Sequence, residues 1–136
     1  MSIKISPSIL GGSFSNIEKI ILDLNQSKAE YIHFDVMDGD FVPNLTFGPQ
    51  FISDVRKFSN KIFDVHLMIN RVEKFLDDYI KAGSDIITFH IEISEDIGNI
   101  INKIKAKGIK CGLAIKPNTS WSKIQPFLKY IDQVII

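Results

Sequence analysis

Residues 85–114 read DIITFHIEISEDIGNIINKIKAKGIKCGLA and contain one complete unit of the fold. A short apolar run at 85–90 precedes a segment of helical period at 97–106, and Gly108 separates that segment from a second apolar run at 109–114. Apolar runs that alternate with helical segments are typical of strand–helix units, which build parallel sheets. The stretch therefore predicts an α/β fold with a parallel sheet.

The same alternation of apolar runs and helical segments recurs along the rest of the chain. We expect strands at 3–6, 30–36, 61–67, 85–90, 109–114 and 131–136. We expect helices at about 13–24, 50–58, 72–81, 97–106 and 121–128. The prediction is therefore six strands and five helices in a single domain that spans residues 1–136.

Two architectures are compatible with this pattern, a (β/α)8 TIM barrel and an open doubly wound sheet. The open sheet is disfavoured because only Gly11 and Gly12 follow the first expected strand, without the glycine fingerprint of a dinucleotide site. A complete barrel usually needs roughly 200 to 250 residues, and this chain has 136. We therefore expect a TIM barrel that is incomplete as given and truncated after its sixth strand.

The composition is that of an ordinary globular protein, with 45% hydrophobic and 24% charged residues. Because 16 basic residues balance 16 acidic ones, no broad basic face is expected for nucleic acid or anionic lipid. No segment approaches the roughly 20 apolar residues of a membrane span, and we expect a cytoplasmic protein that binds a small molecule. The single cysteine, Cys111, lies in an apolar run and is expected to be a buried structural thiol.

Polar side chains gather at the ends of the second and third expected strands. Because side chains alternate along a strand, His33, Asp35 and Met37 share one face, and His66 shares a face with Met68. Neighbouring parallel strands lie about 4.8 Å apart, so His66 can meet the first two across the ladder. The carboxyl ends of barrel strands are where such folds keep their active sites. The sequence therefore predicts a site at this end of the sheet.

Two imidazoles and one carboxylate are a partial ligand set for one divalent metal ion such as Zn, Fe, Mn or Co. A metal-free, salt-bridged cluster remains an alternative, although burying these groups without a cation is costly. The two-histidine, one-carboxylate site of a non-haem iron oxygenase is disfavoured, because such sites usually lie on antiparallel barrels. We expect His90 to be a hydrogen-bonded core residue, and Met37 and Met68 to form a thioether wall beside the metal.

Four motifs, taken together, resemble those of ribulose-phosphate 3-epimerases. They are SPSIL at 6–10, HFDVMDGDFVPN at 33–44, DVHLM at 64–68 and LAIKPNT at 113–119. They occur in the family's order along the whole chain, which makes the resemblance specific although each motif alone is weak. One departure is Asp40, where the family often has histidine, and we interpret it as an adjustment of the loop.

The resemblance implies roles for individual residues. His33, Asp35 and His66 would hold the metal, and Asp35 would also be the catalytic acid or base on one face of the sugar. Ser8 and His66 would bind the substrate. Met37 and Met68 would pack near its reacting carbons.

The resemblance also implies the reaction, which is interconversion of D-ribulose 5-phosphate and D-xylulose 5-phosphate through an enediolate, in a homo-oligomer when complete. In the family the second catalytic carboxylate comes from the seventh strand, and the phosphate is bound by loops after strands six to eight. We therefore expect the 136-residue chain alone to be inactive. Two alternatives stay open, a related hexulose-phosphate 3-epimerase and a non-catalytic half-barrel that needs a partner chain.

Overall fold

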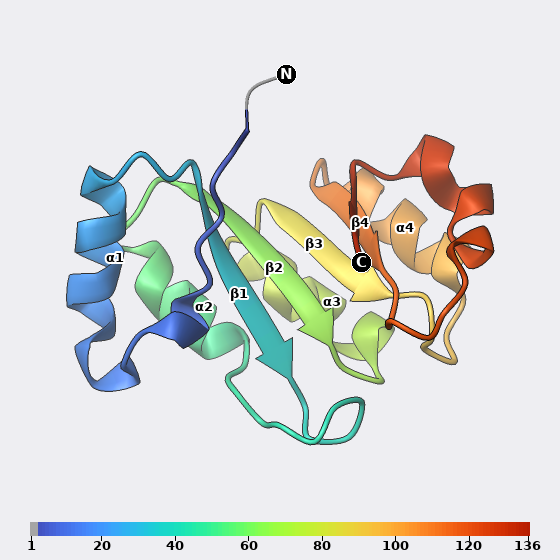
Figure 1. Cartoon of the computed structure of the whole chain (residues 1–136), viewed down its shortest axis with the longest axis horizontal. Helices are drawn as coiled ribbons and strands as arrows, with labels where there is room; N and C mark the ends of the chain where they lie inside the picture. Colours follow the sequence, from blue (N-terminus) through green and yellow to red (C-terminus); the bar gives the residue numbers. More distant parts are fainter. Residues whose placement is uncertain (1–2) are drawn as a thin grey trace.

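Residues 3–136 are described by a computed structural model, in which one parallel sheet of five strands follows the chain order β1-β2-β3-β4-β5. The strands are β1 (Tyr31–Met37), β2 (Ile62–Met68), β3 (Ile86–His90), β4 (Lys110–Ala114) and β5 (Gln133–Ile135). The α-helices are α1 (Ile17–Gln26), α2 (Pro49–Arg56), α3 (Val72–Lys81) and α4 (Ile97–Ala106). Figure 1 shows α2, α3 and α4 behind the sheet, and among the described residues no α-helix covers its opposite face, which is called the open face below.

Four short 3₁₀ helices complete the described elements. They are η1 (Ile9–Gly11), η2 (Phe14–Asn16), η3 (Trp121–Lys123) and η4 (Gln125–Tyr130). The α-helices predicted at 72–81 and 97–106 are confirmed with the predicted bounds. No helix in the described part of the chain is long and apolar enough to cross a membrane.

The strand predicted at 3–6 is not formed, although the segment runs alongside β1. The carbonyl of Ile5 accepts hydrogen bonds from the backbone of residues 30 and 31, at 3.3 Å each, and the carbonyl of Pro7 accepts one from His33 at 2.8 Å. A single parallel bridge joins Ser8 to His33. Pro7 has no N–H group to donate, and Ile3 is 96% exposed, so the segment remains an irregular edge.

The helix predicted at 121–128 is also wrong, because the segment forms two 3₁₀ helices, η3 and η4, in its place. Pro126 explains the difference, since it lies inside the predicted α-helix, where its ring removes an N–H and clashes with the carbonyl four residues earlier. Ile124, between the two turns, is fully buried and anchors the segment to the core. The helix expected from about residue 13 likewise begins as the 3₁₀ turn η2 before α1.

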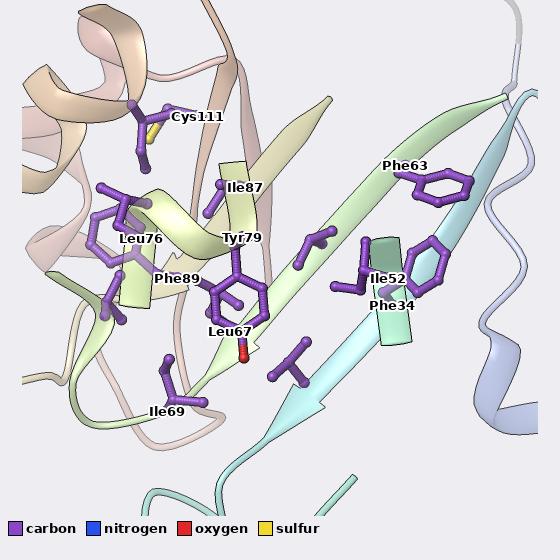
Figure 2. Close-up of a cluster of buried hydrophobic side chains, with 14 of the residues drawn as sticks. Phe34, Ile52, Phe63, Leu67, Ile69, Leu76, Tyr79, Ile87, Phe89 and Cys111 are labelled. Atoms are coloured by element: carbon purple, nitrogen blue, oxygen red, sulfur yellow. The ribbon is translucent and has the colours of Figure 1, made fainter. Parts of the chain in front are cut away.

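The hydrophobic core lies between the sheet and the helices. Figure 2 shows Phe34 of β1 beside Phe63 of β2 and Ile52 of α2, and the two phenylalanine rings have centroids 4.5 Å apart. Full burial of such side chains stabilises the fold by about 1.5 to 3 kcal/mol each. Cys111 lies in the same core as a buried free thiol, as predicted, and burial together with the charge of Asp132 raises its pKa to about 12.

The burial pattern of strand β1 shows which of its side chains lie on the open face of the sheet. Its residues alternate between fully buried and half-buried, and the even-numbered positions, which include Phe34, are the buried ones. Because the even-numbered side chains pack against the helices, the odd-numbered ones project from the open face. His33, Asp35 and Met37 are the odd-numbered residues at the carboxyl end of this strand.

Candidate metal centre

Three side chains meet on the open face of the sheet, at the carboxyl ends of β1 and β2. The strand register pairs Asp35 with His66, and His33 with Asp64. One ligand atom from each of His33, Asp35 and His66 lies within 4.8 Å of the other two. Strand parity and strand order thus bring together the three residues that the sequence pattern selected.

The two imidazoles approach the carboxylate through different nitrogens. Asp35 Oδ1 lies 3.1 Å from His33 Nε2 and 3.3 Å from His66 Nδ1. One oxygen atom therefore faces a nitrogen of each ring, which is a compact set of two nitrogen donors and one oxygen donor. Such a set fits Zn, Fe, Mn or Co, and three protein ligands leave coordination positions for water or a substrate oxygen.

Ser8 fixes the other oxygen of the same carboxylate. Its hydroxyl donates a hydrogen bond of 2.6 Å to Asp35 Oδ2, and its backbone bridges to His33. Ser8 is the N-cap residue of η1, so the turn that follows holds it in place. The structure thus places Ser8 directly against Asp35.

Met37 and Met68 lie two residues beyond Asp35 and His66, at the carboxyl ends of their strands. They are the last residues of β1 and β2 and are partners in the strand register. Both are half-buried. Since they share strand parity with Asp35 and His66 respectively, they belong to the same open face at its carboxyl edge.

The charges within the cluster are strongly coupled. Burial alone would lower the pKa of His33, but hydrogen bonds and charge interactions with Asp35 and Asp64 outweigh it and raise the pKa to about 9. Burial would raise the pKa of Asp35, yet hydrogen bonds from His33 and Ser8 and the positive charge of His33 hold it well below its usual range. Without metal, the proton on His33 partly takes the place of a cation, and a metal ion has to displace it.

Sequence reasoning missed the role of Asp64, whose carboxylate contacts the ring nitrogen of His33 that faces away from Asp35. Asp64 Oδ2 lies 2.8 Å from His33 Nδ1, and Asp64 Oδ1 accepts a 2.8 Å hydrogen bond from Gln133 on β5. Gln133 also donates to the hydroxyl of Thr88 at 2.6 Å. A carboxylate on the far nitrogen of a metal-binding histidine fixes the ring's orientation and tautomer. Asp64 could have been found from strand parity, since it lies two residues before His66.

Sequence reasoning also missed the residues that hold His66. His66 Nε2 lies 2.9 Å from His90 Nε2, and His90 Nδ1 lies 3.1 Å from Glu92 Oε2. His90 is buried and hydrogen-bonded, as predicted, but it also contacts a candidate ligand. Burial lowers the pKa of His90 to about 4, so the ring is neutral near pH 7.

Glu92 is held as a carboxylate at the end of this chain of contacts. Its Oε1 accepts a 2.7 Å hydrogen bond from the backbone N–H of Lys116. Burial raises the pKa of Glu92, but hydrogen bonds from the Thr119 hydroxyl and from Lys116 outweigh this effect and lower it. Glu92 follows the end of β3, so no strand periodicity placed it near the site.

The loop that follows β1 packs beside the cluster. The carboxylate of Asp38 accepts backbone hydrogen bonds from Asp40 and Phe41 and thereby folds the loop back on itself. The ring of Phe41 lies 4.8 Å from that of His90, centroid to centroid, and the Lys116 ammonium lies 3.8 Å over the centroid of the Phe41 ring. Asp40, which departs from the expected histidine, is bonded by the side chain of Asn70 at 2.8 Å.

Comparison with protein families gives a match over nearly the whole chain. Residues 4–136 match the model of the family described as ribulose-phosphate 3 epimerase. A ribulose-phosphate 3-epimerase of Rhodobacter capsulatus is 42% identical over 135 residues, which are 99% of this chain and 59% of the relative. That of Treponema pallidum is 36% identical over 135 residues, or 99% of this chain and 62% of the relative. The chain therefore spans about six tenths of the length of these relatives.

The solved structures that share the fold of this chain are distant in sequence. An N-acetylmannosamine-6-phosphate 2-epimerase of Clostridium perfringens is 14% identical, with a TM-score of 0.65, and the match covers 98% of this chain and 57% of that one. A phosphonopyruvate hydrolase complex is 15% identical, with a TM-score of 0.59, and the match covers 99% and 54%. At these identities only the fold is informative. It confirms a partial TIM barrel.

Proposed function

Because the chain belongs to the ribulose-phosphate 3-epimerase family, we propose that it supplies the metal-binding half of an enzyme that epimerises D-ribulose 5-phosphate to D-xylulose 5-phosphate. The observation that carries this proposal is the convergence of His33 Nε2 and His66 Nδ1 on one oxygen of Asp35. This is the only cluster of histidine, cysteine and carboxylate side chains with metal-binding spacing among residues 3–136. One divalent ion is its proposed cofactor.

The reaction inverts C3 of a 2-ketose, which requires removal of a proton beside a carbonyl and its return to the opposite face. Asp35 is ionised and held in one orientation by Ser8, so its carboxylate can take the proton from one face. A divalent ion held by His33, Asp35 and His66 would supply Lewis-acid stabilisation of the negative charge that develops on the substrate oxygens. In the same proposal Ser8 and His66 contact the sugar.

Met37 and Met68 have a supporting role in this mechanism. Their thioethers flank the carboxyl edge of the site and carry no group that takes up protons near neutral pH. They would exclude water from the planar enediolate without competing with Asp35 as a base. Replacing either residue with a polar one should therefore favour loss of the intermediate to solvent.

The opposite face of the sugar needs a second acid. Asp64 and Glu92 are the carboxylates that contact the histidines around Asp35 in the described part of the chain, and each is already bonded, Asp64 to His33 and Glu92 to His90. We therefore assign the second acid, and the phosphate-binding groups, to the four tenths of the relatives' length that this chain does not span. By the family resemblance, that acid would come from the seventh strand.

A hybrid protein tests this proposal. Residues 1–136 would be joined to the remaining segment of the Rhodobacter capsulatus relative, and conversion of D-ribulose 5-phosphate to D-xylulose 5-phosphate measured with added Zn, Fe, Mn or Co. We expect turnover that is lost in Asp35→Asn and kept in Asp54→Asn, the same change on the exposed outer face of α2. A folded, metal-loaded hybrid without turnover, or an active Asp35→Asn hybrid, would refute the proposal.

The same hybrid separates the pentulose from the hexulose substrate. The cluster faces only the reacting carbons in this proposal, so it accommodates five- and six-carbon ketose phosphates alike. Relative kcat/KM for the two substrates decides between them, and we expect the pentulose phosphate to have the higher value.

A further inference from the structure

A continuous chain of polar contacts leads from the candidate ligand His66 to a backbone N–H group outside the cluster. His66 Nε2 meets His90 Nε2 at 2.9 Å, His90 Nδ1 meets Glu92 Oε2 at 3.1 Å, and Glu92 Oε1 meets the N–H of Lys116 at 2.7 Å. The rings of His66 and His90 stack at 24°, with centroids 5.0 Å apart. His66 and His90 are both buried, so water has little access to replace these contacts.

We propose that Glu92 and His90 are positioning residues that keep the Nδ1 lone pair of His66 free for the metal. This proposal rests on the metal site of the proposed function. Glu92 acts through His90, and neither of them needs to touch the metal or the substrate.

The direction of each hydrogen bond follows from the chemistry of the groups. The ionised carboxylate of Glu92 can only accept, so the facing Nδ1 of His90 must carry a hydrogen. A neutral imidazole has one N–H group, which leaves His90 Nε2 as an acceptor. The facing Nε2 of His66 must then donate to it, and a neutral His66 keeps a bare nitrogen at Nδ1.

That bare nitrogen faces another acceptor. His66 Nδ1 lies 3.3 Å from Asp35 Oδ1, and two acceptors at this distance repel unless a cation is bound by both. The carboxylate of Glu92, two histidine rings away, thus prepares the site for a cation. An arrangement with reversed polarity would place a hydrogen on Nδ1, satisfy Asp35 without a metal and compete with metal binding.

The variant Glu92→Gln creates that reversed arrangement without a change in size. The N–H of Lys116 requires an acceptor, so the glutamine carbonyl has to occupy the place of Oε1. Its NH₂ group then faces His90 Nδ1 and donates to it, which moves the hydrogen of His90 to Nε2. His66 must accept at Nε2 and carry its own hydrogen at Nδ1, toward Asp35.

Two measurements on the 136-residue chain test the proposal. The first reads the tautomers of His90 and His66 from ring ¹⁵N shifts in the metal-free protein. We expect His90 to carry its hydrogen at Nδ1 in the wild type and at Nε2 in Glu92→Gln. The second measures Zn²⁺ affinity by chelator competition, where we expect Glu92→Gln to bind about 10- to 100-fold more weakly, with an unchanged or higher metal-free Tm.

A purely structural role for Glu92 predicts a different order of Zn²⁺ affinities among the Glu92 variants. Glu92→Ala removes the side chain and leaves His90 free to adopt either tautomer, so we expect weaker loss of affinity than in Glu92→Gln. Structural damage would make Glu92→Ala the worse variant. Glu95→Gln is the matched control, because it makes the same change in the same loop, where Glu95 accepts from the N–H of Glu73. It should bind Zn²⁺ like the wild type.

The outcomes separate this inference from the proposed function. Zn²⁺ binding by the wild type with equal affinity in Glu92→Gln would overturn the positioning role and leave the metal site standing. An unchanged His90 tautomer in Glu92→Gln would overturn it as well. Absence of Zn²⁺ binding by the wild type would overturn the proposed metal site and this inference with it.

Discussion

Asp35 and His66 are register partners on neighbouring strands, and Oδ1 of one lies 3.3 Å from Nδ1 of the other. His33 joins them because it lies two residues before Asp35 and shares its strand face. The three ligand atoms are therefore brought together by one strand pair, β1 and β2, without any contribution from a flexible loop. Sites built on strands hold their geometry more closely than sites built on loops.

Strand parity predicts opposite effects for neighbouring residues of β1. His33→Ala should abolish or greatly weaken Zn²⁺ binding with the chain still folded, because it removes a ligand from the half-buried face. Phe34→Leu should leave Zn²⁺ affinity unchanged and lower the free energy of unfolding by about 1 kcal/mol, because Phe34 packs in the core against Phe63. Urea denaturation and metal titration of both variants check this. Equal loss of metal affinity in the two would show that parity does not separate the site from the core.

The part of the site that parity and strand order determine could be predicted from the sequence. His33, Asp35 and His66 alternate with apolar residues on two strands that are adjacent in the chain, and adjacent strands of a barrel pair with each other. The register that sets Asp35 opposite His66 could not be predicted, because a shift by two residues preserves every side chain's face. The sequence therefore predicts the group of residues but not the atoms that meet.

The residues that support the ligands, Glu92 and Gln133, could not be predicted from the sequence for a related reason. Glu92 lies beyond the end of β3, where strand periodicity no longer predicts which way a side chain points. Gln133 lies 69 positions after Asp64 in the sequence and donates to it across the open face. The two wrong predictions of secondary structure have local causes. Pro7 directly follows the first expected strand and cannot donate to a strand ladder, and Pro126 converts the last expected helix into 3₁₀ turns.

Asp64 should control both the charge and the orientation of His33. Asp64→Asn removes a negative charge 2.8 Å from His33 Nδ1, so we expect the pKa of His33 to fall from about 9 toward its usual value. The ring also loses the acceptor that fixes its tautomer, and Zn²⁺ affinity should fall by about 10- to 100-fold. A ¹⁵N-detected pH titration and chelator competition measure the two effects. Asp54→Asn, on the outer face of α2, is the control for the lost charge.

Stability of the metal-free chain should depend on pH through His33. The folded pKa of about 9 lies above the reference value of 6.5, so the proton is bound more tightly in the folded state. The stability that it contributes is fully present below pH 6.5 and is lost as pH rises through 9. We expect the Tm in the presence of a chelator to fall between these two pH values, and His33→Asn to show a smaller fall.

Zn²⁺ should reverse this dependence, because the metal displaces the proton from His33. Affinity should therefore rise with pH up to about 9, and the Tm of the metal-loaded chain should rise with it. Proton release on Zn²⁺ binding can be measured by calorimetry in two buffers of different ionisation enthalpy. Zn²⁺ binding at pH 7 without proton release would contradict the assignment of a protonated His33 to the metal-free state.

The 136-residue chain by itself should bind a divalent metal weakly and should not epimerise D-ribulose 5-phosphate. Asp35 can exchange a proton on one face of the sugar, but Asp64 and Glu92 are already bonded to histidines and neither is free to serve the other face. Proton exchange at C3 without inversion is therefore the most that Asp35 can support.

An assay in ²H₂O distinguishes these outcomes. Purified chain with Zn, Fe, Mn or Co would be incubated with D-ribulose 5-phosphate, and both deuterium at C3 and D-xylulose 5-phosphate would be measured. We expect no D-xylulose 5-phosphate, and any deuterium exchange should disappear in Asp35→Asn, which also controls for contaminating host enzyme. D-xylulose 5-phosphate formed in an Asp35-dependent manner would contradict the prediction. Because Asp64 and Glu92 are both bonded to histidines, a second copy of the chain would then have to supply the missing acid, and activity should rise with the square of chain concentration.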